Sequence, residues 1–177
     1  MAPENQGVLD PYHVLSLLPL RPYESLADIG CGSGYFTVDL GKYLSRGKLY
    51  AMDIQEEMVQ ACRDRVQQAH LSNVEVLRCR EISFPVSPAS LDCAFLAFVL
   101  HETEDRQSFL AAVAKLLRPG AWCAVLEWYR QKMDEGPPFA YRVTSKQVRQ
   151  FAAGVGLTYK WQRDLNDKQY MVMLTKK

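Results

Sequence analysis

Three glycines at alternate positions are the most distinctive feature of the sequence: Gly30, Gly32 and Gly34 in the segment DIGCGSG. Glycine has no Cβ, so such a segment turns sharply and lets a ligand approach its backbone closely. Asp53 follows roughly 20 residues downstream, the spacing at which Rossmann-type sites bind the hydroxyls of a ribose. Asp53 also has a structural interpretation, as the cap of a helix that starts near Gln55. The pattern predicts a nucleoside-containing ligand at this turn.

The glycine spacing separates two classes of ligand. The dinucleotide fingerprint requires a glycine three residues after its second glycine, and that position is Tyr35. The third glycine falls at Gly34 instead. A bulky side chain at position 35 crowds the helix-to-strand packing that brings a helix N-terminus to a pyrophosphate. The sequence therefore favours a ligand without phosphates, such as an adenosyl amino acid, over NAD.

His101 and Glu102 follow a long apolar run, at the carboxyl end of a predicted strand, where open α/β sheets bind ligands. With an ordinary pKa of about 6.5, a largely neutral imidazole accepts a proton near physiological pH. His101 is therefore the candidate catalytic residue. The structural alternatives are that His101 only satisfies a backbone group and that Glu102 begins the next helix, where the helix dipole favours a carboxylate.

Aromatic side chains add two further candidate contacts. Tyr12 and His13, in a short N-terminal segment, either cover the ligand or serve in packing. Trp128 and Tyr129, just past the fifth predicted strand, either line a substrate pocket or belong to the core.

Short apolar runs alternate with helix-period segments, which is typical of a mostly parallel sheet covered by helices on both faces. Strands are predicted over 25–29, 48–52, 74–77, 91–99 and 121–127. Helices are predicted over 35–44 and 145–151. A third helix has its apolar face at Met58, Cys62, Val66 and Ala69. A fourth is expected to be capped by Thr103 and to stop at Pro119 and Gly120. Two last strands, 157–161 and 170–174, are close enough for a hairpin. Because parallel crossovers need about a dozen residues or more, this hairpin implies one antiparallel strand.

Residues 28–37, DIGCGSGYFT, resemble the first motif of class I S-adenosylmethionine-dependent methyltransferases. Residues 51–54 with Met58 resemble the second motif, residues 91–102 the fourth-strand motif, and residues 117–121 the turn before the fifth strand. The resemblance runs from about residue 11 to the C-terminus and is to the small, single-domain branch. It implies an α/β, Rossmann-like, doubly wound sheet of seven strands, mostly parallel, with an antiparallel strand in the C-terminal hairpin. It also implies one methyltransferase domain over 1–177, with an N-terminal helical segment, 1–20, packed on it.

The resemblance further implies a cofactor site. Its residues are Asp28, Gly30, Cys31, Gly32, Gly34, Met52, Asp53, Ile54, Met58, Glu81, Ile82 and Phe98. The glycines lie under the methionine portion, Asp53 binds the ribose diol, and Met52 and Ile54 flank the sugar and adenine. Glu81 is expected to bind the adenine amine, at a position where the family more often has aspartate. Arg80 is the alternative residue for this contact.

Composition limits the partners. The chain has 177 residues, 48% of them apolar, and 21 basic against 20 acidic residues without a long basic run, so no nucleic-acid partner is expected. No apolar stretch approaches the roughly 20 residues that span a bilayer, and residues 1–10 lack a secretory signal pattern, so no membrane association and a cytoplasmic location are expected. The five scattered cysteines predict mostly reduced, packed thiols and no metal site.

The predicted reaction is direct displacement of the methyl group of S-adenosylmethionine by a small-molecule acceptor, with S-adenosylhomocysteine as product. Holding donor and acceptor in line is the protein's main contribution. Two alternatives stay open: a non-catalytic member of the same fold that binds the cofactor or a partner, and, less favoured, an NAD-dependent oxidoreductase. The acceptor itself is not specified by the sequence, since fold does not fix function.

Overall fold

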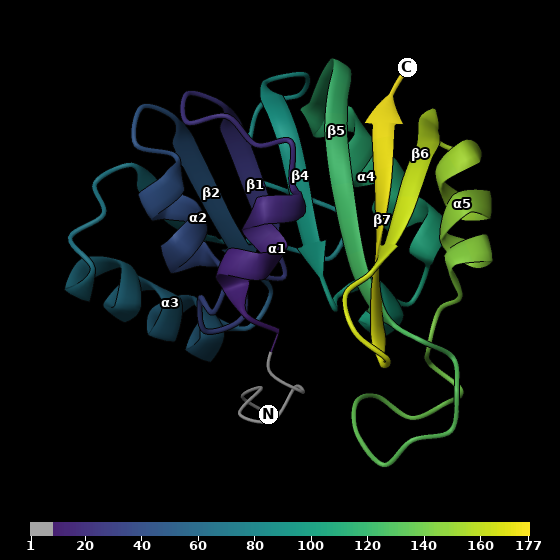
Figure 1. The fold of residues 1–177 in the computed structure, drawn as a ribbon. Helices are drawn as coiled ribbons and strands as arrows, with labels where there is room; N and C mark the ends of the chain where they lie inside the picture. The colour runs from purple at the N-terminus through teal and green to yellow at the C-terminus, as the bar shows by residue number, and fades with distance from the viewer. Residues whose placement is uncertain (1–8) are drawn as a thin grey trace.

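One seven-stranded sheet organises the protein (Figure 1), whose computed structural model describes residues 9–177. The strand order is β3-β2-β1-β4-β5-β7-β6. The strands are β1 (Ser25–Ile29), β2 (Lys48–Asp53), β3 (Val74–Arg78), β4 (Leu91–Ala97), β5 (Leu117–Trp128), β6 (Leu157–Asp164) and β7 (Gln169–Lys176). Strands β1 to β5 pair in parallel, and β7 runs antiparallel to both β5 and β6. The predicted fold class, including the reversed strand in the C-terminal hairpin, is confirmed.

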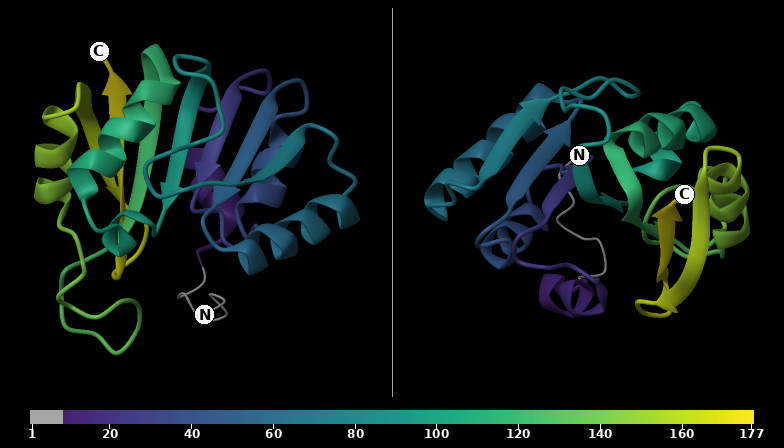
Figure 2. Two further views of the ribbon diagram at one scale, coloured as in Figure 1. Left: turned by 180° about the vertical axis from the view of Figure 1, so that it is seen from behind. Right: turned by 90° about the horizontal axis from the view of Figure 1, so that it is seen from above.

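Helices cover both faces of the sheet (Figures 1 and 2). They are α1 (Pro11–Leu17), α2 (Thr37–Tyr43), α3 (Glu56–Gln68), the short 3-10 helix η1 (Leu100–Glu102), α4 (Arg106–Leu116) and α5 (Ser145–Ala153). Helices α1 and α2 pack with Leu26 and Phe95 on one face, while α4 and α5 pack with Ala27 and Leu96 on the other. Alternating residues of the central strands thus face opposite helix layers, and both faces are apolar.

The structure corrects the prediction for helix α4 at both ends. Asp105, not Thr103, caps the helix: its side chain accepts hydrogen bonds from the backbone N–H groups of Gln107 and Ser108 at 3.0 and 3.1 Å. The Thr103 hydroxyl instead donates to the Leu100 carbonyl at 2.9 Å. At the other end, β5 begins at Leu117 and runs through the predicted stop at residues 119–120, because Leu117 already pairs with Leu91 of β4.

The N-terminal segment was predicted over 1–20, and residues 1–8 of it lie outside the described residues. Within the described part, α1 begins after Asp10, whose side chain accepts a hydrogen bond from the Tyr12 N–H at 3.0 Å. Its buried residue Val14 packs in the same cluster as Leu18 and Leu40. Among residues 9–177, no helix is long and apolar enough to cross a bilayer.

Candidate cofactor and acceptor sites

The glycine turn after β1 needs each of its three glycines for a different reason. Gly30, Gly32 and Gly34 all have positive φ values, +74°, +53° and +87°. A Cβ on Gly30 would lie 2.6 Å from Val99 Cγ2, and one on Gly34 would lie 2.9 Å from Cys62 Sγ, whereas one on Gly32 would meet nothing within 4 Å. Gly30 and Gly34 therefore allow the turn to pack against neighbouring elements, and Gly32 presents bare backbone to an open space.

Asp53, at the end of β2, connects this turn to helix α3. Its Oδ2 accepts a hydrogen bond from the Gly32 N–H and its Oδ1 accepts one from the Gln55 N–H, both at 2.9 Å. Asp53 is nevertheless not the cap of α3: Gln55 is the N-cap residue and makes no side-chain capping bond, and at this end of the helix Asp53 accepts only the N–H of Gln55 itself. A carboxylate oxygen accepts more than one hydrogen bond, so the same side chain has capacity left for a ligand hydroxyl.

A cavity of about 340 Å³ opens at the carboxyl ends of β1, β2 and β4. The predicted cofactor residues that line it are Asp28, Gly30, Cys31, Gly32, Asp53, Ile54, Met58, Glu81 and Phe98. Three others do not line it: Gly34 packs against α3, Met52 is fully buried, and Ile82 is exposed. The Met52 carbonyl nevertheless supports the turn by accepting from the N–H groups of Gly30 and Cys31 at 2.8 and 3.0 Å.

Several lining residues were missed by the sequence reasoning. They include Tyr35, Phe36, Gln55, Cys79, Phe84, Ala97, Val99, Thr103, Glu104 and Phe109. The loop after β3 folds back toward α4, where Glu81 Oε1 accepts a hydrogen bond from the Glu104 N–H at 2.7 Å. Arg80, the rival of Glu81, lines the same cavity. Contacts between segments more than 20 residues apart leave no periodic signal in the sequence.

The buried carboxyl group of Asp28 lies at the base of this cavity. It accepts a hydrogen bond from the Thr37 hydroxyl at 2.6 Å. Burial raises the pKa of Asp28 to about 7, the charge of Asp53 acts in the same direction, and the Thr37 hydrogen bond opposes the rise. The carboxyl group is therefore partly protonated at neutral pH.

A second cavity, of about 420 Å³, adjoins the first. It is lined by Phe98, His101, Glu102, Trp128, Gly136, Pro137, Pro138 and Tyr141. Phe98 and Glu102 line both cavities. Strand β4 was predicted to extend to residue 99 but ends at Ala97, because Phe98 adopts a φ of +60°. A bulky side chain in this left-handed region is strained, and such residues cluster at functional sites.

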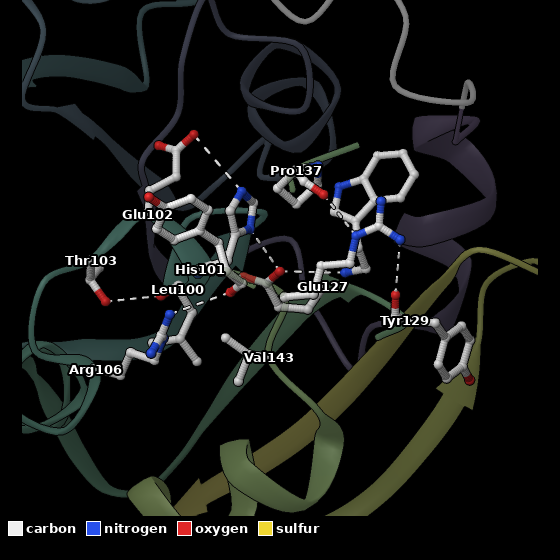
Figure 3. A network of polar contacts seen from close by, with 12 residues as sticks. Leu100, His101, Glu102, Thr103, Arg106, Glu127, Tyr129, Pro137 and Val143 are labelled. Atoms are coloured by element: carbon white, nitrogen blue, oxygen red, sulfur yellow. Dashed lines mark hydrogen bonds and ion pairs between the residues drawn. The ribbon is translucent and has the colours of Figure 1, made fainter. Parts of the chain in front are cut away.

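His101 does not line the first cavity and belongs to the second. Its ring lies between two carboxylates (Figure 3): Nδ1 is 2.8 Å from Glu127 Oε2, and Nε2 is 4.0 Å from Glu102 Oε1. Burial lowers the pKa of His101, but the hydrogen bond and charge of Glu127, with the charge of Glu102, outweigh burial, so the pKa is raised above its ordinary value. The sequence marks Glu127 only as the end of a predicted strand, although it is the one carboxylate in the apolar run of β5.

One wall of the second cavity is the loop between β5 and α5, and Arg142 holds it in place. The guanidinium is buried and donates to the carbonyls of Gln131, Glu135 and Pro137 at 2.6, 2.6 and 2.8 Å. Gly136 in this loop lies flat on the Trp128 ring, since a Cβ on it would be 2.7 Å from the indole. Contacts within the chain thus hold this wall in position.

The remaining aromatic candidates were expected either to line a ligand site or to serve in packing, and the structure gives a different outcome for each. Trp128 is buried and lines the second cavity. Tyr129 lines neither cavity, and its hydroxyl donates to the carboxylate of Asp164. Tyr12 is 66% exposed, and neither it nor the exposed His13 lines these cavities.

Comparison with known proteins gives a consistent result. The family model "Methyltransferase domain" matches residues 27–125. The ubiquinone/menaquinone biosynthesis C-methyltransferase UbiE of Marinomonas sp. (strain MWYL1) is 27% identical over 124 residues, which is 69% of this chain and 49% of that protein. The demethylmenaquinone methyltransferase of Lactococcus lactis is 24% identical over 139 residues, 72% of this chain and 55% of that protein. The chain thus spans about half the length of these curated relatives.

Among solved structures, a SAM-dependent methyltransferase from Aquifex aeolicus matches over nearly the whole chain. The TM-score is 0.91 at 29% sequence identity, and the match covers 98% of this chain and 93% of that one. The match therefore also covers most of residues 126–177, which lie beyond the matched family model.

Proposed function

Since the chain belongs to the class I S-adenosylmethionine-dependent methyltransferase family, we propose that it transfers a methyl group from this cofactor to a small-molecule acceptor. The observation that carries the proposal is the junction of the two cavities at Phe98 and Glu102. A donor in the first cavity and an acceptor in the second would meet there, and orientation of two reactants is the main source of rate in such a transfer.

The first cavity fits the cofactor chemically. Among the described residues that line it, Arg80 is the one basic side chain, and none lies on the glycine turn, so the turn has no cation to meet a phosphate. Asp53 suits the ribose hydroxyls, and Asp28 suits positive charge. Ile54 and Met58 offer apolar surface for adenine, with Glu81 or Arg80 at its edge. When bound, S-adenosylmethionine supplies a methyl group that its positive sulfur has already activated.

The second cavity is proposed as the acceptor site. Its walls are mainly aromatic and proline side chains, and its polar groups come from His101, Glu102 and the Tyr141 hydroxyl. Such a cavity suits a small, flat, mostly apolar molecule with one ionisable position. The relatives described above are a ubiquinone/menaquinone biosynthesis C-methyltransferase and a demethylmenaquinone methyltransferase, which supports a small-molecule acceptor. We also propose a cytoplasmic location, because the thiol form of all five cysteines suits a reducing compartment.

Calorimetric titration tests the cofactor part of the proposal. S-adenosylmethionine and S-adenosylhomocysteine are expected to bind, and NAD is expected not to. Binding of NAD without a response to either adenosyl ligand would contradict the proposal. A screen of acceptors with turnover measured then separates an enzyme from a protein of this fold that binds the cofactor and transfers nothing.

The His101→Ala variant tests the division between the two cavities. Because His101 lines only the second cavity, S-adenosylmethionine affinity is expected to stay within about twofold, while turnover falls by about 10²-fold or more, the usual scale of general acid–base catalysis. A large loss of cofactor affinity would show that His101 supports the first cavity instead, and the general-base role would be abandoned.

A further inference from the structure

We propose that Glu127 is the positioning residue of a Glu–His pair, holding the proton of His101 on Nδ1 so that Nε2 is the atom that takes a proton from the acceptor. The chemical role rests on the proposed function. The arrangement of the pair rests on geometry alone and is tested separately.

Glu127 makes three contacts around His101, and two of them are to that residue (Figure 3). Oε1 accepts from the His101 backbone N–H at 3.0 Å, and Oε2 is 2.8 Å from the ring Nδ1. Oε2 also accepts a longer hydrogen bond, 3.4 Å, from the Trp128 N–H. These contacts fix both the main chain of η1 and the rotation of the imidazole relative to the end of β5.

Because Glu127 is buried, its contact with Nδ1 determines which ring nitrogen of His101 carries the proton. The Glu127 side chain is fully buried, and an ionised carboxylate without partners is costly there. A carboxylate accepts hydrogen bonds and does not donate them, so the ring atom that faces it carries a proton. In the neutral imidazole the other nitrogen, Nε2, then has the free lone pair.

Other charged groups around the ring do not replace this contact. Glu102 Oε1 is 4.0 Å from Nε2, beyond hydrogen-bond distance, and its side chain is 67% exposed. Arg106, on α4, acts against the positive charge of the imidazolium. Tyr170 is the register partner of Glu127 on β7, but its buried phenol donates to the Val143 carbonyl at 2.5 Å and not to the carboxylate.

The proposed transfer balances as follows. Nε2 accepts the proton of the acceptor, and the electron pair of the broken bond to hydrogen forms the new bond to the methyl carbon. The electron pair of the broken carbon–sulfur bond stays on the sulfur of the departing thioether. Glu127 stays hydrogen-bonded to Nδ1 and stabilises the imidazolium, which returns its proton to solvent.

A purely structural alternative is that Glu127 only ties η1 to β5. It predicts a loss of stability on substitution but no particular pKa or tautomer for His101. Titration of the three histidines by NMR separates the two, with His13 and His70, both exposed, as references in the same spectra. The ¹⁵N shifts of a ring distinguish a proton on Nδ1 from one on Nε2.

In the wild-type protein, His101 is expected to titrate above about 6.5, the ordinary value for histidine, and its neutral form to carry the proton on Nδ1. Glu127→Gln is expected to lower the pKa of His101 to about 6.5 or below and to remove the tautomer preference. Glu127→Asp keeps the charge at a shorter reach and is expected to restore part of the raised pKa. Glu57→Gln, the same substitution on the exposed face of α3, is the matched control and is expected to change neither.

A wild-type His101 whose neutral form carries its proton on Nε2, or a Glu127→Gln variant that remains folded with an unchanged His101 titration, would overturn the proposal. Cofactor titration of Glu127→Gln keeps the proposed function separate, since Glu127 does not line the first cavity and affinity is expected to be unchanged. Once an acceptor is found, the acid limb of kcat against pH is expected to follow the measured pKa of His101. Glu127→Gln is expected to lower kcat at neutral pH by about tenfold or more without a matching rise in KM.

Discussion

At the scale of single residues, the two aspartates that line the first cavity have different surroundings. Asp53 receives hydrogen bonds from two backbone N–H groups that belong to different elements. Asp28 receives one from the Thr37 hydroxyl and is more deeply buried. Asp53 therefore holds the shape of the glycine turn, while Asp28 is the group whose charge changes near neutral pH.

Asp53→Ala is expected to weaken S-adenosylmethionine binding by about 1.5–3 kcal/mol, the scale for hydrogen bonds to a charged group. It is also expected to lower the free energy of unfolding, because the N–H groups of Gly32 and Gln55 lose their acceptor. Calorimetry and thermal unfolding measure the two effects. Asp53→Asn, which keeps one acceptor oxygen, should be intermediate in both, and an unchanged affinity in the alanine variant would mean that the ribose is held elsewhere.

The ratio of S-adenosylmethionine to S-adenosylhomocysteine affinity is expected to rise between pH 6 and pH 8. The two ligands differ by the positive charge of the sulfonium, and with a pKa of about 7 the Asp28 carboxyl gains its negative charge across this interval. The increase should be several-fold in calorimetric titrations. Asp28→Asn should abolish it, and the same increase in that variant would assign the pH dependence to another group.

The raised pKa of Asp28 also makes stability depend on pH with a defined sign. Between pH about 4 and pH about 7, the folded protein keeps the Asp28 proton and the unfolded chain has lost it, so the Asp28 contribution to stability falls as pH rises. The difference in Tm between Asp28→Asn and wild type, without ligand, is expected to shift in favour of the variant over this range. A difference that is constant with pH would contradict the shifted pKa.

At the scale of elements, the second cavity depends on a loop without regular structure. Residues 129–141 lie between β5 and α5, and the Arg142 guanidinium is hydrogen-bonded to four of their carbonyls. Arg142→Met removes these bonds and is expected to cost about 2–4 kcal/mol in unfolding free energy. Limited proteolysis should cut the loop faster, while cofactor affinity stays within about twofold. Arg142→Lys, which keeps the charge but has fewer donors, is the control, and an unchanged cleavage rate in Arg142→Met would refute the role.

The features that the sequence predicts well are those formed within a single element or turn. Strand β1, the glycine turn and Asp53 are recognisable because each has a local pattern: an apolar run, a glycine spacing and a fixed interval. The Glu127–His101 pair and the Glu81–Glu104 contact join residues that are 26 and 23 positions apart, and no local pattern marks them. The Arg142 contacts are closer along the chain, but they lie in a loop without a periodic pattern. Thr103 was predicted as a cap because it is a good capping residue type, but Asp105 sits closer to the helix and accepts from two N–H groups.

At the scale of the whole molecule, the two cavities are lined by successive parts of the chain. The first is lined by residues between 28 and 109, the second by residues between 98 and 141, and the overlap is Phe98 and Glu102. The sheet provides the common support, because β1, β2, β4 and β5 end at the same edge. Cofactor binding is therefore expected to order the half of this edge at the first cavity and to leave the half at the second cavity, the proposed acceptor site, as it is.

Hydrogen exchange with and without S-adenosylhomocysteine measures this division. At a ligand concentration of about 100 times Kd, binding adds about 2.7 kcal/mol to the unfolding free energy, so amides that exchange only through global unfolding slow by about 100-fold throughout the sheet. Amides that exchange through local opening respond only where the ligand lies. Exchange at the turn after β1 and at Gln55 should slow, while the loop over 131–141 should exchange at its former rate. NAD is the negative control and should change neither region. Equal slowing of the turn and of the 131–141 loop would mean that the cofactor closes the acceptor cavity as well, and the two sites would then have to be treated as one cooperative unit.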